Sequence, residues 1–178
     1  RAHPDFPCAA VASLQVEVTP LADGLRLDYC LRGDLVALRL PSPAAPVEPD
    51  RLWAHTCFEV FLARGDGAAY REYNFSPSGQ WAAYSFTGYR QPDGAVPALP
   101  CPILAWRQDA GELALEVTLP AAALPPGDGA LCLALTTVVE LEDGVLSYWA
   151  LRHPAGKPDF HHRDGFAPPP CPDLLEPR

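Results

Sequence analysis

The sequence contains no methionine, one lysine and one asparagine among its 178 residues, the last two being Lys157 and Asn74. Its other basic side chains are arginine or histidine, so a general bias against lysine and asparagine accounts for most of this shortage. Where such a residue is nevertheless present, its particular chemistry is a reason to examine its surroundings. Lys157 and Asn74 fall in two of the three segments discussed below.

Other features that the chain lacks exclude whole classes of protein. No stretch approaches the roughly 18–20 uncharged apolar residues of a membrane-spanning helix, so we expect no membrane partner. The formal net charge of -9 is spread along the chain, which disfavours binding to nucleic acid phosphates. The sequence has no G-x-S-x-G, H-E-x-x-H or glycine-rich phosphate loop. We therefore expect a binding domain and no enzyme.

The six cysteines include no C-x-x-C pair and are irregularly spaced. We expect reduced thiols here, because disulfide frameworks belong mainly to small secreted domains. Reduced thiols favour a cytoplasmic location. Since the sequence begins at Arg1, a removed targeting peptide and a periplasmic or secreted location stay open.

Alternation of apolar and polar residues is the dominant pattern, and it is clearest at 25–31 and 113–119. Similar runs lie near 13–18, 35–40, 53–62, 69–75, 80–87, 102–107, 131–139 and 145–151. With 22 prolines, the chain is typical of short strands joined by proline-bearing loops. We predict one all-β domain over 1–178, an antiparallel β-sandwich of about ten strands, jelly-roll or immunoglobulin-like, with a proline-rich C-terminal tail. The predicted core contains Leu25, Leu27, Leu113, Leu115, Val117, Leu133 and Leu135.

Three short connections have hairpin length, namely 33–34, 76–79 and 109–111. The only helix that the pattern suggests is a short one at 120–124.

The first chemically informative segment is 52–62, LWAHTCFEVFL, which is apolar on both faces as a central strand would be. Alternation places His55 and Glu59 on one face of that strand. A buried carboxylate needs a partner, so either these groups bond to neighbours at the strand ends or their face lines a concave site. Trp53, at the start of the segment, is a candidate aromatic contact for a ligand.

The second segment is the hairpin 70–81, YREYNFSPSGQW. Glu72 and Asn74 project to the same side, and Trp81 follows the turn. Aromatic faces bind the apolar side of a sugar ring while carboxylates and amides bind its hydroxyls, so this combination suits a sugar site. An ordinary aromatic core with polar groups outside gives the same pattern.

The third segment is 146–166, which holds the only lysine and three of the five histidines. We predict that the loop 153–166 folds back against the sheet face carrying His55, Glu59, Glu72 and Asn74. Its three histidines, Lys157 and Arg163, together with Arg152 just before it, would then pair with the two acids. Such pairing serves either a binding site or a structural brace. Metal binding by Asp159, His161, His162 and Asp164 is a further alternative, without a recognised zinc spacing. The candidate ligand-binding residues of this segment are Tyr148, His153, Lys157, Asp159, His161 and His162.

Segments 52–62 and 70–81 together resemble the central strands of the DOMON-like superfamily, which is related to family 9 carbohydrate-binding modules. Segment 149–166, WALRHPAGKPDFHHRDGF, is similar to the hallmark of a bacterial DOMON-like subgroup. The three segments cover about a third of the chain. The resemblance implies a β-sandwich that binds a sugar or haem. Thr56 occupies the position at which this superfamily often has an acid, which departs from the pattern for calcium or sugar contacts.

The leading hypothesis is a non-catalytic module for a small ligand, with a sugar ahead of haem and no cofactor. Haem-binding relatives commonly use methionine with histidine as axial ligands, so haem would here require two histidines or a histidine with Lys157. A protein-interaction domain without a small ligand is the third alternative.

Overall fold

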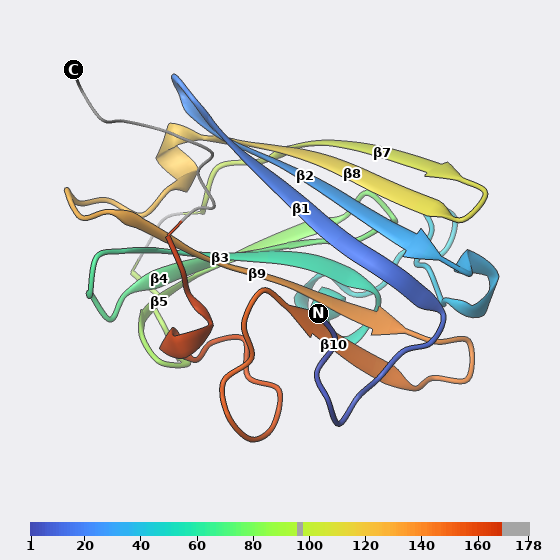
Figure 1. Cartoon of the computed structure of the whole chain (residues 1–178). Helices are drawn as coiled ribbons and strands as arrows, with labels where there is room; N and C mark the ends of the chain where they lie inside the picture. Colours follow the sequence, from blue (N-terminus) through green and yellow to red (C-terminus); the bar gives the residue numbers. More distant parts are fainter. Residues whose placement is uncertain (96–97, 169–178) are drawn as a thin grey trace, which may run out of the picture.

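Two antiparallel sheets lie face to face in the computed structural model, which describes residues 1–95 and 98–168 (Figure 1). The four-stranded sheet contains, in spatial order, β1 (Val11–Leu21), β2 (Gly24–Gly33), β8 (Glu112–Pro120) and β7 (Ile103–Asp109). The six-stranded sheet contains β10 (Leu146–Ala150), β9 (Leu131–Glu140), β3 (Cys57–Arg64), β4 (Tyr70–Phe75), β5 (Trp81–Gly88) and β6 (Gln91–Pro92). Four short 3₁₀ helices are η1 (Leu35–Ala37), η2 (Pro49–Ala54), η3 (Ala121–Ala123) and η4 (Arg163–Gly165). The predicted antiparallel sandwich is confirmed.

The core lies between the two sheets, where the inward-facing residues of alternating strands meet. All seven predicted core residues are at most 5% exposed. Phe58 on β3 connects the layers, since its ring contacts Tyr29 of β2 at 5.3 Å and Trp106 of β7 at 5.4 Å between centroids. The hydroxyl of Tyr29 also donates a hydrogen bond to the main-chain carbonyl of Glu59 at 3.0 Å. The central strand β3 is therefore held firmly against the opposite sheet.

Three details of the predicted strand map are wrong. Residues 35–37 form η1, because the Asp34 side chain accepts a hydrogen bond from the Val36 amide at 3.2 Å and turns the chain after β2. Strand β3 begins at Cys57, since Pro49 starts η2 and this helix continues to Ala54. The two-residue β6 is too short for alternation to predict. The turns at 76–79 and 109–111 do connect hairpins, whereas 33–34 does not, since it leads from β2 into η1. Helix η3 lies within the predicted helical segment.

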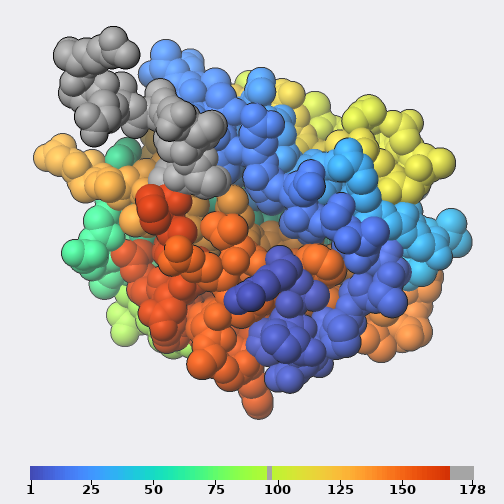
Figure 2. All heavy atoms as spheres, in the orientation of Figure 1, coloured from blue at the N-terminus to red at the C-terminus, as the bar shows by residue number. Residues whose placement is uncertain are grey.

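The segment after β10 crosses the outer face of the six-stranded sheet, and Figure 2 shows it beside the N-terminal residues on the surface. His153 Nε2 lies 3.0 Å from the Arg1 carbonyl, and His3 Nε2 lies 2.9 Å from the Gly156 carbonyl. No helix within 1–95 or 98–168 is long and apolar enough to cross a membrane.

The five cysteines within the described residues are all free. Cys171 and most of the predicted proline-rich tail lie outside the described residues.

Candidate functional site

A cavity of about 540 Å³ opens on the outer face of the six-stranded sheet, within the range of small-molecule sites. Its floor is formed by alternate residues of five neighbouring strands. These residues are Glu59 and Phe61 of β3, Glu72 of β4, Tyr84 and Phe86 of β5, Val138 of β9, and Leu146 and Tyr148 of β10. Because strand residues alternate between faces, their neighbours in the chain point into the core.

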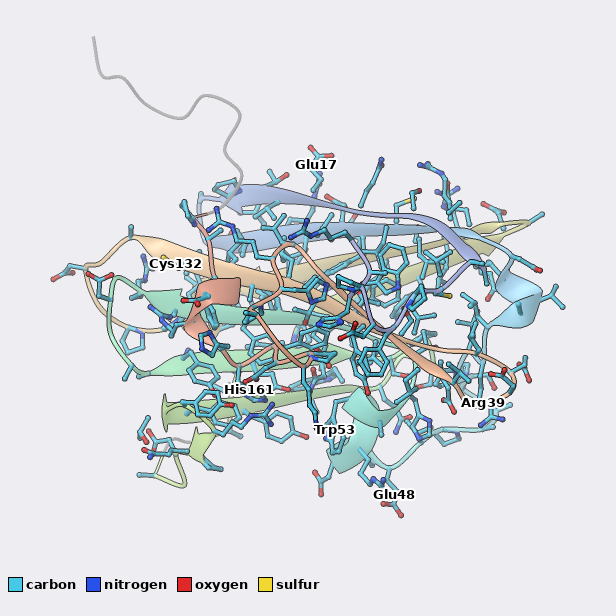
Figure 3. The ribbon with its side chains drawn as sticks, turned by 60° about the horizontal axis from the view of Figure 1, so that its bottom comes forward. Glu17, Arg39, Glu48, Trp53, Cys132 and His161 are labelled. Atoms are coloured by element: carbon cyan, nitrogen blue, oxygen red, sulfur yellow. The ribbon has the colours of Figure 1, made fainter. Side chains whose placement is uncertain are left out.

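The walls of the cavity come from three segments outside the strands. Helix η2 contributes Asp50, Trp53 and Ala54, the loop after β10 contributes Pro158, Phe160 and His161, and the β5–β6 turn contributes Arg90. Figure 3 shows Trp53 and His161 on the same side of the molecule, opposite to Glu17. The indole of Trp53 is half exposed, so its face is available to a ligand.

Two acids at the floor are held by polar neighbours that do not line the cavity. Glu59 is flanked in register by Asn74 of β4 and Thr136 of β9. Thr136 donates its hydroxyl proton to Glu59 Oε2 at 2.8 Å, and Asn74 Nδ2 donates to Glu72 Oε1 at 2.8 Å. Glu59 and Glu72 are diagonal neighbours on β3 and β4, since Glu72 pairs with Phe61. Such neighbours lie close enough for their charges to interact.

Burial controls the protonation of both acids. It raises the pKa of Glu59 to about 8, with a further contribution from the charge of Glu72, while the hydrogen bond from Thr136 opposes the rise. Burial also raises the pKa of Glu72 to about 7, against the hydrogen bond from Asn74 and the charge of Arg90. At neutral pH the floor therefore holds protons that ordinary glutamates would have lost.

His161 stands over Glu72 in a fixed orientation. The Tyr70 hydroxyl accepts a hydrogen bond from the Arg90 main-chain amide at 3.1 Å and lies 2.7 Å from His161 Nδ1. This arrangement favours donation from the tyrosine to Nδ1, which leaves the proton of the neutral imidazole on Nε2. Nε2 is 3.9 Å from Glu72 Oε2, too far for a direct hydrogen bond. Burial and the charge of Arg90 lower the pKa of His161 to about 4, so the ring is neutral at pH 7.

An aromatic cluster fixes the loop that carries His161. Phe61, Tyr70 and Phe166 pack with ring centroids 6.0–6.3 Å apart, and His161 contacts Phe61 at 5.1 Å. The Asp159 carboxylate accepts hydrogen bonds from Tyr89 Oη at 2.6 Å and from Arg90 Nη2 at 3.0 Å, and these connect the loop to the β5–β6 turn. The loop thus folds back onto this face, as its sequence suggested.

Six of the twelve candidate ligand-binding residues belong to this region. Trp53, Glu59, Glu72, Tyr148 and His161 line the cavity, and Asn74 is buried beside Glu59, its cross-strand partner. Asp159 is at the rim, where it pairs with Arg90. The other five are elsewhere: His55, Trp81, His153, Lys157 and His162.

The predicted placement of His55 and Trp81 is wrong. His55 follows η2 instead of lying within β3, and its Nδ1 is 2.8 Å from Glu140 Oε2. The tight turn 76–79 places Trp81 opposite Phe75, so its indole packs on the core side near Tyr73.

The cationic partners predicted for the acids are also wrong, apart from the proximity of His161. Lys157 is exposed, and the described part of the chain offers it no ion pair within 4.0 Å. Arg152 is likewise exposed, and Arg163 donates to the Gly65 carbonyl at 2.7 Å. His153 lies beside the N-terminal segment, and His162 caps η4. The loop closes the cavity by apolar packing more than by charge.

Sequence reasoning missed Asp50, Tyr84, Phe86, Arg90 and Phe160. For Tyr84 and Phe86 a signal was available, because a turn of the length of 76–79 pairs Glu72 with Tyr84 across the hairpin. The same register excludes Trp81 from the cavity face. No local sequence pattern predicts that Asp50 and Arg90 line the cavity.

His55, one of the predicted site residues, takes part in a structural brace around Glu140. This buried carboxylate receives Arg39 Nη1 at 2.9 Å as well as the His55 contact. We expect Glu140→Gln to lower the free energy of unfolding by about 1–2 kcal/mol, because a charged hydrogen-bonded pair is lost in a buried setting. Urea denaturation checks this, with the exposed Glu142→Gln as a control that changes it by less than about 0.5 kcal/mol. Equal values for the two variants would contradict the bracing role.

Within residues 1–95 and 98–168, no group of three or more His, Cys, Asp or Glu side chains is arranged to hold a metal ion. The alternative of metal binding by Asp159, His161, His162 and Asp164 is therefore not supported by their geometry.

The fold is similar to that of a proposed carbohydrate-binding protein from Bacteroides uniformis, known from its crystal structure. The match has a TM-score of 0.62 and covers 92% of this chain and 79% of that chain. With 13% sequence identity, the likeness concerns the fold alone. No family model matches the chain, and no curated protein matches it significantly.

Proposed function

We propose that this domain binds a carbohydrate in the cavity on the outer face of the six-stranded sheet, as a non-catalytic module. The observation that carries the proposal is the combination of aromatic side chains with two carboxyl groups in one cavity. Trp53, Tyr84, Phe86, Tyr148 and Phe160 surround the acids Glu59 and Glu72. Aromatic faces suit the apolar C–H side of a sugar ring, and carboxyl oxygens suit its hydroxyls.

The positions of the two acids favour binding over hydrolysis. Glycoside hydrolysis by two carboxyl groups needs one on each side of the scissile bond. Glu59 and Glu72 both project from the same face of one sheet, from neighbouring strands. A ring lying over the floor would have both acids on one side, which suits hydrogen bonding to hydroxyls.

Relationship to the DOMON-like superfamily is part of the same proposal, and the fold shared with the Bacteroides uniformis protein supports it at the level of architecture. Haem has less support, because His161 is the one candidate axial ligand among the residues that line the cavity. A pure interaction domain would fill this face with its own side chains. The half-exposed Trp53 and the open cavity argue for a ligand.

Substitution of Trp53 by alanine tests the proposal. We expect at least a tenfold loss of sugar affinity, since stacking of an aromatic ring on a sugar contributes on the order of 1.4 kcal/mol or more. The melting temperature should change little, because half of this side chain is already in solvent. Isothermal titration calorimetry against a panel of oligosaccharides measures the affinity.

Ile103→Ala is the matched control, as Ile103 is 71% exposed on β7 of the other sheet. Two results would count against the proposal. One is a folded native protein that binds no sugar in the panel, and the other is equal affinity of the Trp53→Ala variant and the native protein.

A further inference from the structure

Each acid at the cavity floor has one oxygen that is already bonded and one that is not. Glu59 Oε2 receives Thr136, and Glu72 Oε1 receives Asn74. Thr136 and Asn74 flank Glu59 in register on the same face of the sheet, and neither lines the cavity. Within the described residues, Glu59 Oε1 and Glu72 Oε2 have no hydrogen bond. These two carboxyl oxygens are therefore available to accept hydrogen bonds from a ligand.

A third acceptor lies beside them on the same face of the sheet. Asn74 is fully buried, and its Oδ1 has no hydrogen-bond partner among the described residues. Asn74 is the register partner of Glu59 across β3 and β4. Buried polar atoms are rarely left without a partner, so this amide oxygen calls for a donor, which a protonated neighbouring acid or a ligand would supply.

The charges around the floor leave the acids without a counterion. Arg90 also lines the cavity, but its guanidinium is paired with Asp159 at 3.0 Å. His161 is neutral at pH 7, and its Nε2 stays 3.9 Å from Glu72. Asp50 adds a third acid to the lining. A buried acid without a cationic partner is unfavourable, and a bound cation would relieve it.

We propose that the ligand is an amino sugar whose protonated amine binds between Glu59 and Glu72 at the floor of the cavity. This inference rests on the proposed function and names the class of sugar. An ammonium group carries three N–H donors and no acceptor, which complements two free carboxyl oxygens better than a hydroxyl does. The protons balance, because a neutral amine can accept the proton that Glu59 or Glu72 carries and so become the bound ammonium group.

The aromatic residues of the floor favour the same group. Aromatic rings attract a cation through the negative charge of their faces, and Tyr84, Phe86 and Tyr148 share the floor with the two acids. An acetylated amine is neutral and offers one N–H donor, so it would leave one acid unpartnered. Discrimination between the amine and its acetamide follows from the arrangement of the acceptors.

Three tetramers with the same β-1,4-linked glucose backbone test the inference, since they differ at C2 alone: an amine, an acetamide or a hydroxyl. We expect calorimetry at pH 7 to give at least tenfold tighter binding for the amine tetramer than for the other two. Glu72→Gln and Glu59→Gln should each remove most of this preference. Glu17→Gln makes the same chemical substitution at an exposed position on the opposite side of the molecule and should preserve the preference (Figure 3).

The possible results distinguish a failure of the amino-sugar inference from a failure of the proposed carbohydrate binding. Equal binding of the three tetramers would refute the amine and leave carbohydrate binding intact. No binding of any tetramer by the folded protein would overturn both. Cyclohexylamine provides an amine on a ring without hydroxyls, and if it bound as tightly as the amine tetramer, the ligand would be an amine and not a sugar. A Glu72→Gln variant with the native melting temperature and an unchanged preference would also refute the inference.

Discussion

Replacing Phe61 by alanine is expected to lower the free energy of unfolding by about 3–5 kcal/mol, because it removes a buried aromatic ring and its packing contacts. Phe61 is 1% exposed on the cavity face of β3, and its ring packs against Tyr70, His161 and Phe166. Its removal leaves the loop that carries His161 without its central apolar contact. Besides destabilisation, we expect faster proteolytic cleavage between 153 and 166.

Urea denaturation and timed proteolysis measure these two effects. Ile103→Ala removes an aliphatic side chain that is 71% exposed, and it should change the free energy of unfolding by less than about 0.5 kcal/mol. A Phe61→Ala variant that lost less than about 1 kcal/mol would show that the loop is held by other contacts, such as those of Asp159 with Tyr89 and Arg90.

The free energy of unfolding should fall as the pH rises from about 4.5 to about 8, through the titration of Glu59 and Glu72. In this window the unfolded acids lose their protons first, since burial raises the folded pKa of Glu59 to about 8 and that of Glu72 to about 7. The folded state then binds more protons, so its stability decreases with rising pH and levels off above the folded pKa values. The total loss is on the order of a few kcal/mol.

Glu59→Gln should remove most of this pH dependence and make the protein more stable than the native form at pH 8. The amide is similar in size to the carboxylic acid, cannot ionise, and ends the repulsion of Glu72. Urea denaturation at pH 5, 6, 7 and 8 gives the slope, with Glu17→Gln as the control that retains it. If the free energy of unfolding of the native protein stayed constant or rose between pH 5 and pH 8, the floor acids would be ionised in the folded state.

Alternation along the chain was sufficient to predict the sheets and the core, because each half-buried strand repeats its pattern over several residues. Leu25, Leu27, Leu115 and Val117 are all buried as expected. The pattern failed where a side chain or a proline turns the backbone, as at Asp34 and Pro49. Such local turns depend on single residues, and an average over a run does not detect them.

The candidate site was predictable in part for a related reason. Glu59 was identified because a carboxylate in a buried strand requires an explanation, and Glu72 and Asn74 because they project to the same side of an aromatic hairpin. Trp81 was counted among the ligand contacts because the register of its hairpin was not applied to it. Arg90 comes from a turn whose backbone has a positive φ of 53°, and neither its position nor its pairing with Asp159 follows from any pattern along the chain.

The alternation of faces along β4 and β5 also has a consequence for protein engineering. On β5, Tyr84 and Phe86 face the cavity while Trp81 and Ala83 pack against the core, so each strand carries two independent sets of positions. Randomising Ala82, Tyr84 and Phe86 with Tyr148 of β10 would diversify the ligand surface and leave the contacts between the sheets untouched. The domain can therefore serve as a scaffold in which new specificities are selected without rebuilding the core.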